Sequence, residues 1–204
     1  MADYDFAKIE KKLSKYLDED RFQHTMGVMY TSACLAMVHG YDIKDAQVSG
    51  LLHDCAKCIP NKKKLKMCSE HNIPVSDFER SHPFLLHSRL GAYIAHEKYE
   101  IDDQEILSAI NYHTTGRREM SLLEKIIYIA DYIEPMRYKA SRLPEIRKLA
   151  FEDLDECMYE ILKDTLEYLE ENPKEIDSTT RDAYVYYKDL HDRKMQDAAN
   201  RQED

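Results

Sequence analysis

The sequence predicts an all-α protein, and three observations lead to that prediction. Apolar residues recur at helical spacing along nearly the whole chain, and no convincing alternating segment typical of a strand is present. Leu, Ala, Glu, Lys and Met are abundant, whereas only five glycines and six prolines occur in 204 residues. A chain of this length can bury one generous core. We therefore expect a single domain over 1–204, with its core at about 20–190 and a polar tail at 196–204.

The individual helices follow from where the periodic pattern starts and stops. Gly40, Pro60 and Pro135 mark three of the stops, because proline cannot continue a helix and the residue before it avoids helical backbone angles. Turn residues break the stretch 61–80 into shorter pieces. Apart from these short pieces, helices are expected at about 3–19, 22–38, 45–58, 84–98, 102–112, 121–134, 144–171 and 180–199.

Composition excludes several classes of protein. The formal net charge of −10 argues against a protein that coats nucleic acid or anionic membranes. No run approaches the roughly 18 apolar residues of a membrane span, and the acidic start of the chain lacks an apolar signal region. The five cysteines are too few and too irregular for a disulfide framework. We therefore expect a cytoplasmic protein with no nucleic-acid or membrane partner.

Six ionisable side chains fall on or beside apolar helix faces. His24 shares a stripe with Val28 and Leu35, and Asp131 shares one with Ile127, because residues three and four apart lie on the same helix face. An isolated buried carboxylate costs several kcal/mol or more, so it neutralises or finds a partner. A single divalent cation could bind several of these six side chains at once. Imidazole and carboxylate are suitable ligands for iron, manganese or zinc. The six are His24, His53, Asp54, His87, His113 and Asp131.

The pattern of His24, the adjacent pair His53-Asp54, and Asp131 resembles the HD superfamily of phosphohydrolases. The surrounding segments GLLHDCAK (50–57) and IADYIEP (129–135) make the match specific. More narrowly, the chain resembles the YqeK-type family of bacterial symmetrical bis(5′-nucleosyl)-tetraphosphatases, which cut diadenosine tetraphosphate (Ap4A) into two ADP. This resemblance runs from about Arg21 to Tyr184. It is carried further by RFQHTMGV (21–28), LLHS (85–88), HTTG (113–116) and SLLEK (121–125).

The resemblance implies a single HD-domain helical bundle with a metal centre. It makes His24, His53, Asp54 and Asp131 the ligands, most simply of iron, with manganese, zinc or magnesium as other candidates and one or two ions. His87 and His113 have two open roles, as contacts of the nucleotide or as ligands of a second metal. The residues expected around the nucleotide are Arg21, His87, Ser88, Arg89, Leu90, His113, Arg137, Glu175, Ile176, Asp177, Ser178, Thr179 and Thr180.

The expected reaction is attack of metal-activated water on an inner phosphorus, with a nucleoside diphosphate as leaving group. Lys57, three residues after Asp54, would neutralise phosphate charge. His87 or His113 would protonate the leaving group. The expected catalytic residues are therefore Asp54, Lys57, His87 and His113. The partner is a nucleotide such as Ap4A, ADP or a GDP-like molecule, and the family also suggests a homodimer.

Two departures from the family pattern affect the nucleotide contacts. The Pro-Gly pair usual after the arginine at 137 is replaced by Lys139-Ala140-Ser141, and Ser178-Thr179-Thr180 stands where the family tends to show Pro-x-Thr.

Three other readings remain open. The chain could be another HD phosphohydrolase acting on a dNTP, a nucleotide or a cyclic nucleotide. It could also be a non-catalytic nucleotide-sensing module. The spacing Cys55-x-x-Cys58 and Cys68-x-x-His71 superficially resembles a zinc site, but the first pair flanks Lys57 within the expected His-Asp helix.

Overall fold

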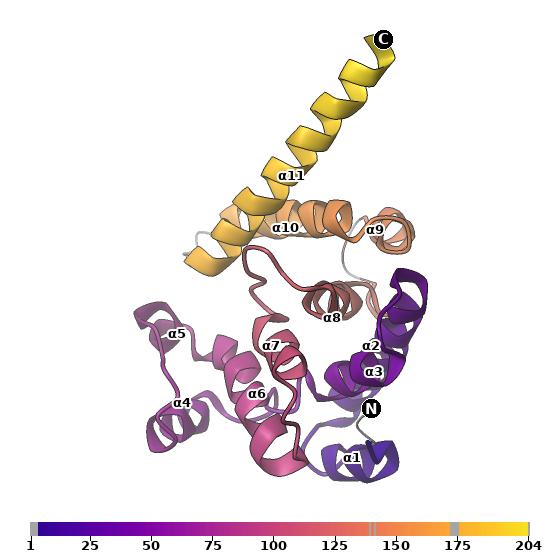
Figure 1. Cartoon of the computed structure of the whole chain (residues 1–204). Coiled ribbons are helices and arrows are strands. Elements are labelled where there is room, and N and C mark those ends of the chain that lie inside the picture. The colour runs from indigo at the N-terminus through magenta and orange to yellow at the C-terminus, as the bar shows by residue number, and fades with distance from the viewer. Residues whose placement is uncertain (1–3, 139, 141, 172–175, 204) are drawn as a thin grey trace.

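The computed structural model describes residues 4–138, 140, 142–171 and 176–203, which contain helices and no β-strand. The predicted all-α class is therefore confirmed (Figure 1). The elements are α1 (Phe6–Leu13), α2 (Glu19–His39), α3 (Ile43–Leu52), α4 (Asn61–Glu70), α5 (Asp77–Ser81), the 3₁₀ turn η1 (Pro83–Leu85), α6 (Leu86–Tyr99), α7 (Gln104–Tyr112), α8 (Leu122–Ile133), α9 (Leu143–Ala150), α10 (Leu154–Glu171) and α11 (Ser178–Glu203).

Helices α2, α3, α6, α7 and α8 form the inner part of the molecule. Helix α2 packs on α3 and α8, and α7 packs on α6 and α8. Helix α10 covers α8 and carries α9 and α11 on its sides, whereas α4, α5 and η1 lie beside α6 (Figure 1). One cluster of buried apolar residues extends from Ile9 to Tyr187. The ends of the inner helices meet within this core, and that meeting point holds the polar cluster described below.

Local sequence explains where most helices begin. Asp18, Asp42 and Asp103 precede α2, α3 and α7, and each side chain accepts a backbone N–H of the first turn. Ser76 and Ser121 form complete capping boxes with the glutamate three residues later. Such caps satisfy N–H groups that have no partner within the helix. The starts of these helices are thus encoded locally.

The predicted helix over 45–58 was too long at its C-terminal end. Helix α3 ends at Leu52, and turns follow as far as Cys58. In a continuing α-helix the carbonyl of Gly50 would accept the N–H of Asp54. Instead it lies 2.6 Å from Nδ1 of His53, whose ring takes over that acceptor. The turn that follows is tighter, with the N–H of Lys57 bonded to the carbonyl of Asp54 at 2.9 Å.

Three other helix boundaries also differ from the prediction. The segment 144–171 is two helices, because residues 151–153 turn the chain and Asp153 caps the start of α10. Helix α1 is shorter than the predicted 3–19. Helix α11 continues through the expected polar tail to Glu203, and its exposed second half projects from the body (Figure 1).

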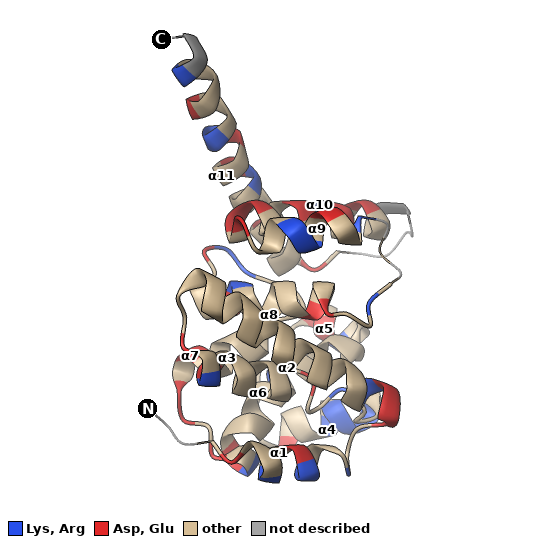
Figure 2. Ribbon diagram, turned by 90° about the vertical axis from the view of Figure 1, so that its right-hand side faces the viewer, with Lys and Arg blue, Asp and Glu red and all other residues tan. Residues whose placement is uncertain are grey.

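Charged residues are concentrated on the outer helices. In Figure 2 acidic residues mark much of the ribbon of α10, and basic and acidic residues alternate along α11. Within the described part of the chain, no helix is both long and apolar enough to cross a membrane. The negative net charge of the chain therefore lies largely away from the inner helix ends.

We expect Asp153→Ala to lower the free energy of unfolding by about 1 kcal/mol, the usual cost of losing a helix cap. Its Oδ1 lies 3.0 Å from the backbone nitrogens of Asp155 and Glu156, and Oδ2 lies 2.6 Å from Nζ of Lys194 on α11. Chemical denaturation of Asp153→Ala beside Glu152→Ala, a substitution at an exposed neighbour, measures this effect.

The stabilisation by Asp153 should also depend on pH. Burial opposes ionisation, but hydrogen bonds from Lys194 and the N–H of Glu156 lower the pKa of Asp153 below its usual range. The contribution is complete above the unfolded pKa of about 3.9 and is lost as the pH falls through the lower folded pKa. An equal effect of Asp153→Ala at neutral pH and at strongly acidic pH would contradict this assignment.

Candidate metal centre

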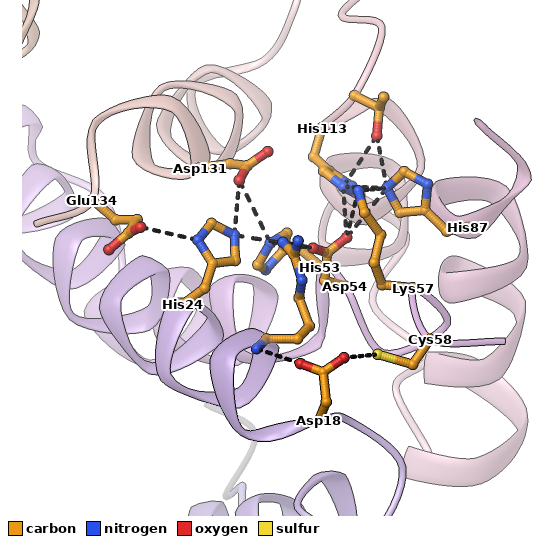
Figure 3. A network of polar contacts seen from close by, with 12 residues as sticks. Asp18, His24, His53, Asp54, Lys57, Cys58, His87, His113, Asp131 and Glu134 are labelled. Atoms are coloured by element: carbon orange, nitrogen blue, oxygen red, sulfur yellow. Dashed lines mark hydrogen bonds and ion pairs between the residues drawn. The ribbon is translucent and has the colours of Figure 1, made fainter. Parts of the chain in front are cut away.

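The four expected metal ligands lie together where α2, the end of α3 and α8 meet. Nε2 of His24 lies 3.0 Å from Oδ1 of Asp131 and 4.0 Å from Oδ2 of Asp54. Nε2 of His53 lies 3.5 Å from Oδ2 of Asp54 and 3.9 Å from Oδ1 of Asp131. Figure 3 shows these side chains pointing toward one another from α2, from α8 and from the segment that follows α3. Sequence reasoning placed them on inward faces, and the structure brings them into one cluster.

Three histidine rings of this cluster are held in the same way. Nδ1 of His53, His87 and His113 each donates to the backbone carbonyl three residues earlier, at 2.6, 2.6 and 2.7 Å. A carbonyl oxygen can only accept, so Nδ1 carries the proton in each ring. The opposite nitrogen, Nε2, is then left to the interior of the cluster. Neutral imidazole with a free Nε2 is the form that binds a metal.

His24 is oriented by a carboxylate instead. Its Nδ1 lies 3.0 Å from Oε1 of Glu134, which is only 1% exposed, and the N–H of Met136 donates to Oε2 of Glu134 at 2.7 Å. A Cβ at Gly27 would lie 2.6 Å from Oε2, so any larger residue there would force this carboxylate to shift. Carboxylates commonly fix metal-binding histidines in this way. Sequence reasoning missed Glu134, although its place three residues after Asp131 was an available signal.

The centre contains buried polar atoms that lack hydrogen bonds. Among the described residues these include Nε2 of His24, Nε2 of His53 and Oδ1 of Asp54. The candidate ligand atoms form two groups, and within each group all atoms lie within 4.8 Å of one another. One group is His24, His53 and Asp131, and the other is His53, Asp54 and His113. Buried polar atoms without partners are costly, and a cation satisfies all of them. The nitrogen and oxygen donors present therefore fit a divalent transition metal.

Both aspartates are held in the ionised form. Burial opposes ionisation of Asp54, but the imidazoles of His53, His113 and His87 outweigh it and keep its pKa well below the usual range. Burial likewise opposes ionisation of Asp131, yet nearby imidazoles and Arg137 hold its pKa well below the usual range. Carboxylates must be deprotonated to bind a metal, so both are in the required state.

His87 and His113 extend the cluster on the far side of Asp54. Their Nε2 atoms lie 3.1 Å apart, and 3.2 and 3.4 Å from Oδ1 of Asp54. Burial lowers the pKa of His87 to about 4, so this ring is neutral near neutral pH. Nζ of Lys57 lies 3.0 Å from Nε2 of His87, and the hydroxyl of Thr114 lies 3.1 Å from both Nε2 atoms. Thr114 was not foreseen from the sequence.

Two predicted arginines lie beside the same carboxylates. Nη1 of Arg21 is 2.8 Å from Oδ2 of Asp54, and Nη2 of Arg137 is 2.8 Å from Oδ1 of Asp131. Their side chains remain 29% and 46% exposed, so both guanidinium groups lie at the border between the cluster and solvent. A guanidinium in that place can contact a phosphate with two parallel N–H groups.

The other expected nucleotide contacts do not share one environment. Ser88, Arg89 and residues 177–179 line one cavity of about 170 Å³, in which Nε of Arg89 pairs with Oε1 of Glu79 at 3.1 Å. Leu90 is fully buried in the hydrophobic core, and Thr180 is also buried. Ile176 is half-buried, whereas Glu175 lies outside the described residues.

The cysteines do not join either group of candidate ligands within the described chain. Sγ of Cys55 is buried and lies 3.4 Å from the carbonyl of Gly91. Cys58 is exposed, with its Sγ 3.3 Å from Oδ2 of Asp18. The resemblance of their spacing to a zinc site therefore finds no support in the geometry.

Comparison with known proteins gives consistent matches. The model of the HD domain family matches residues 21–136. A Bacillus subtilis protein named symmetrical bis(5′-nucleosyl)-tetraphosphatase is 39% identical over 157 residues, covering 77% of this chain and 83% of the relative. A Halalkalibacterium halodurans protein of the same name is 39% identical over 154 residues, covering 76% and 81%.

A solved structure is also similar. It is the crystal structure of a predicted HD superfamily hydrolase involved in NAD metabolism from Clostridium acetobutylicum. The TM-score is 0.88 at 37% sequence identity, covering 93% of this chain and all of the other.

We expect Glu134→Ala to weaken metal binding by about tenfold to a hundredfold, because His24 loses the group that fixes its ring. Titration of metal-free protein with Mn²⁺ or Zn²⁺ measures the affinity directly. Gly27→Ala, which displaces the same carboxylate, should also weaken binding, whereas Glu145→Ala at an exposed position of α9 serves as the control. Unchanged affinity in both Glu134→Ala and Gly27→Ala would rule out this role.

Proposed function

Since the chain belongs to the HD domain family and, within it, to the symmetrical bis(5′-nucleosyl)-tetraphosphatases, we propose how its buried cluster serves that reaction. The protein is a metal-dependent hydrolase that converts Ap4A into two ADP. The observation that carries the site assignment is that buried atoms of His24, His53 and Asp54 without hydrogen bonds lie in one cluster, beside the partly exposed Arg21.

We assign His24, His53, Asp54 and Asp131 as the metal ligands. Iron is the proposed metal, because imidazole and carboxylate donors suit it, and manganese, zinc and magnesium are the alternatives. A bound divalent ion supplies Lewis-acid stabilisation of phosphoryl charge and activates water as a nucleophile. His87 and His113 are neutral-nitrogen donors in reach of Asp54, which supports a second ion at that end.

The chain's own residues then hold the polyphosphate and balance its charge. Hydrolysis joins the oxygen of water to an inner phosphorus and breaks the central phosphorus–oxygen bond, so that each half leaves as ADP. Arg21 and Arg137 contact the non-bridging oxygens on the exposed side of the cluster. Holding the polyphosphate in line with the attacking water is the main task in phosphoryl transfer.

Lys57 is the proposed cation for the leaving group. Its Nζ lies 3.6 Å from Oδ1 of Asp54 and 3.0 Å from Nε2 of His87, at the end of the cluster formed by His87 and His113. A departing phosphate with a second pKa of about 6 is weakly basic, so it needs charge neutralisation more than a proton. The neutral ring of His87 suits an acceptor or ligand role better than the acid role expected from the sequence.

Three further assignments complete the proposal. Residues 1–204 act as one domain, supported by the single apolar cluster from Ile9 to Tyr187. The five free cysteines support a reducing compartment, for which we propose the cytoplasm. A homodimer is proposed from the family alone.

A dNTP, nucleotide or cyclic-nucleotide activity and a non-catalytic sensing role are not favoured, because the named relatives are tetraphosphatases.

Purified protein should give ADP as the only nucleotide product from Ap4A, and chelation of the metal should abolish the reaction. Asp54→Asn should lower kcat by about a thousandfold or more, because a metal contributes several kcal/mol to such a transition state. Chromatographic product analysis and elemental analysis of the same samples test both points, with the exposed Asp77→Asn as control. Full activity of Asp54→Asn would refute the ligand assignment.

Lys57→Gln should lower kcat by about a hundredfold, the usual cost of removing one preorganised group that stabilises developing charge. Its metal content should stay at the wild-type level, because Lys57 is not a ligand. The matched control is Lys62→Gln, which removes an exposed lysine of α4. Equal rates for the two variants would exclude Lys57 from the reaction.

A further inference from the structure

Two cavities are lined by residues of the polar cluster or by residues close to them in the chain. The cavity of about 170 Å³ is lined by Ser88 and Thr115, close in sequence to His87 and His113. A larger cavity of about 490 Å³ is lined by His24 and Glu134. Figure 3 shows His24 and Glu134, which line the larger cavity, at one end of the network and His87 and His113 at the other. The larger one is called the α2–α8 cavity below. Its other lining residues include Asp20, Arg21, Gln23, Met136, Arg137 and Tyr138.

The chemistry of a symmetrical cleavage requires space on both sides of the scissile bond. Two identical nucleoside diphosphate halves extend from the central anhydride in opposite directions. Of the expected nucleotide contacts, Ser88, Arg89 and 177–179 line the smaller cavity, whereas Arg21 and Arg137 line the α2–α8 cavity. The volume of the α2–α8 cavity falls within the roughly 300–1,000 Å³ usual for small-molecule sites.

We propose that the α2–α8 cavity is a second nucleotide subsite, which holds the other nucleoside diphosphate half of the substrate. This inference rests on the proposed function. Arg21 and Arg137 stand at the inner wall of the cavity, against Asp54 and Asp131, where the phosphates enter from the centre. The phosphate end of this subsite therefore holds two guanidinium groups, each paired with a carboxylate of the centre, and the carboxylates of Asp18, Asp20 and Glu134 line the same cavity.

Tyr138 provides the surface for the base. It directly follows Arg137, and its side chain is 80% exposed, which makes it the most exposed large hydrophobic residue among those described. Met136 beside it is 62% exposed. An exposed aromatic ring stacks on any nucleobase, because every base has a π-face. The carboxylate of Asp20 in the same wall can accept hydrogen bonds from a ribose hydroxyl or a base amino group.

The test compares Ap4A with adenosine 5′-tetraphosphate, which has the same phosphate chain but only one nucleoside. For each variant the ratio of kcat/KM between the two substrates is measured. Tyr138→Ala should reduce this preference for Ap4A by about tenfold, in keeping with the usual effect of one base stack, and Tyr138→Phe should retain it. Tyr30→Ala is the matched control, because Tyr30 is an exposed tyrosine of α2 outside the α2–α8 cavity.

A binding measurement separates this inference from the proposed function. Calorimetric titration of the metal-loaded wild-type protein should give two ADP per chain, and Tyr138→Ala should weaken one of the two sites. A single ADP per chain, or an unchanged substrate preference in Tyr138→Ala, would overturn the second subsite. If wild-type protein releases no ADP from Ap4A, the proposed function fails, and the ADP stoichiometry still decides whether the second subsite exists.

Discussion

The geometry of the centre depends on how the imidazole rings are held by their Nδ1 atoms. In three of the rings Nδ1 donates to a backbone carbonyl one turn earlier, and in His24 it faces the buried carboxylate of Glu134. Each bond leaves Nε2 directed into the cluster. For His53 the acceptor is the carbonyl of Gly50, and helix α3 ends at the residue before His53. The end of this helix and the orientation of a ligand ring therefore coincide.

The charge of the centre is balanced from two sides. Inside, the imidazoles stabilise the ionised forms of Asp54 and Asp131. Outside, Arg21 and Arg137 pair with the same carboxylates while staying partly exposed. The acidic residues that give the chain its negative charge lie instead on outer helices such as α10 (Figure 2). Two partly exposed arginines thus stand at the border where a highly charged polyphosphate would meet the centre.

Helical periodicity was informative where a side chain's direction follows from its place in a regular helix. His24 and Asp131 were recognised as inward-facing on that basis, and both contribute to the cluster. The same reasoning extended α3 too far, because apolar residues continue through Cys55 and Ala56 although the hydrogen bonding changes at His53. Periodicity also missed the turn at 151–153, since apolar residues flank it on both sides.

The sequence by itself determined the helical class, the family resemblance and the inward position of the ligand residues. These features depend on local spacing and on short motifs, which a single chain displays directly. Only the tertiary structure decided that Glu134 faces His24, that Gly27 makes room for it, and that a cavity opens beside both His24 and Glu134. Those features arise where helices distant in sequence meet, and their distances depend on packing rather than on any local pattern.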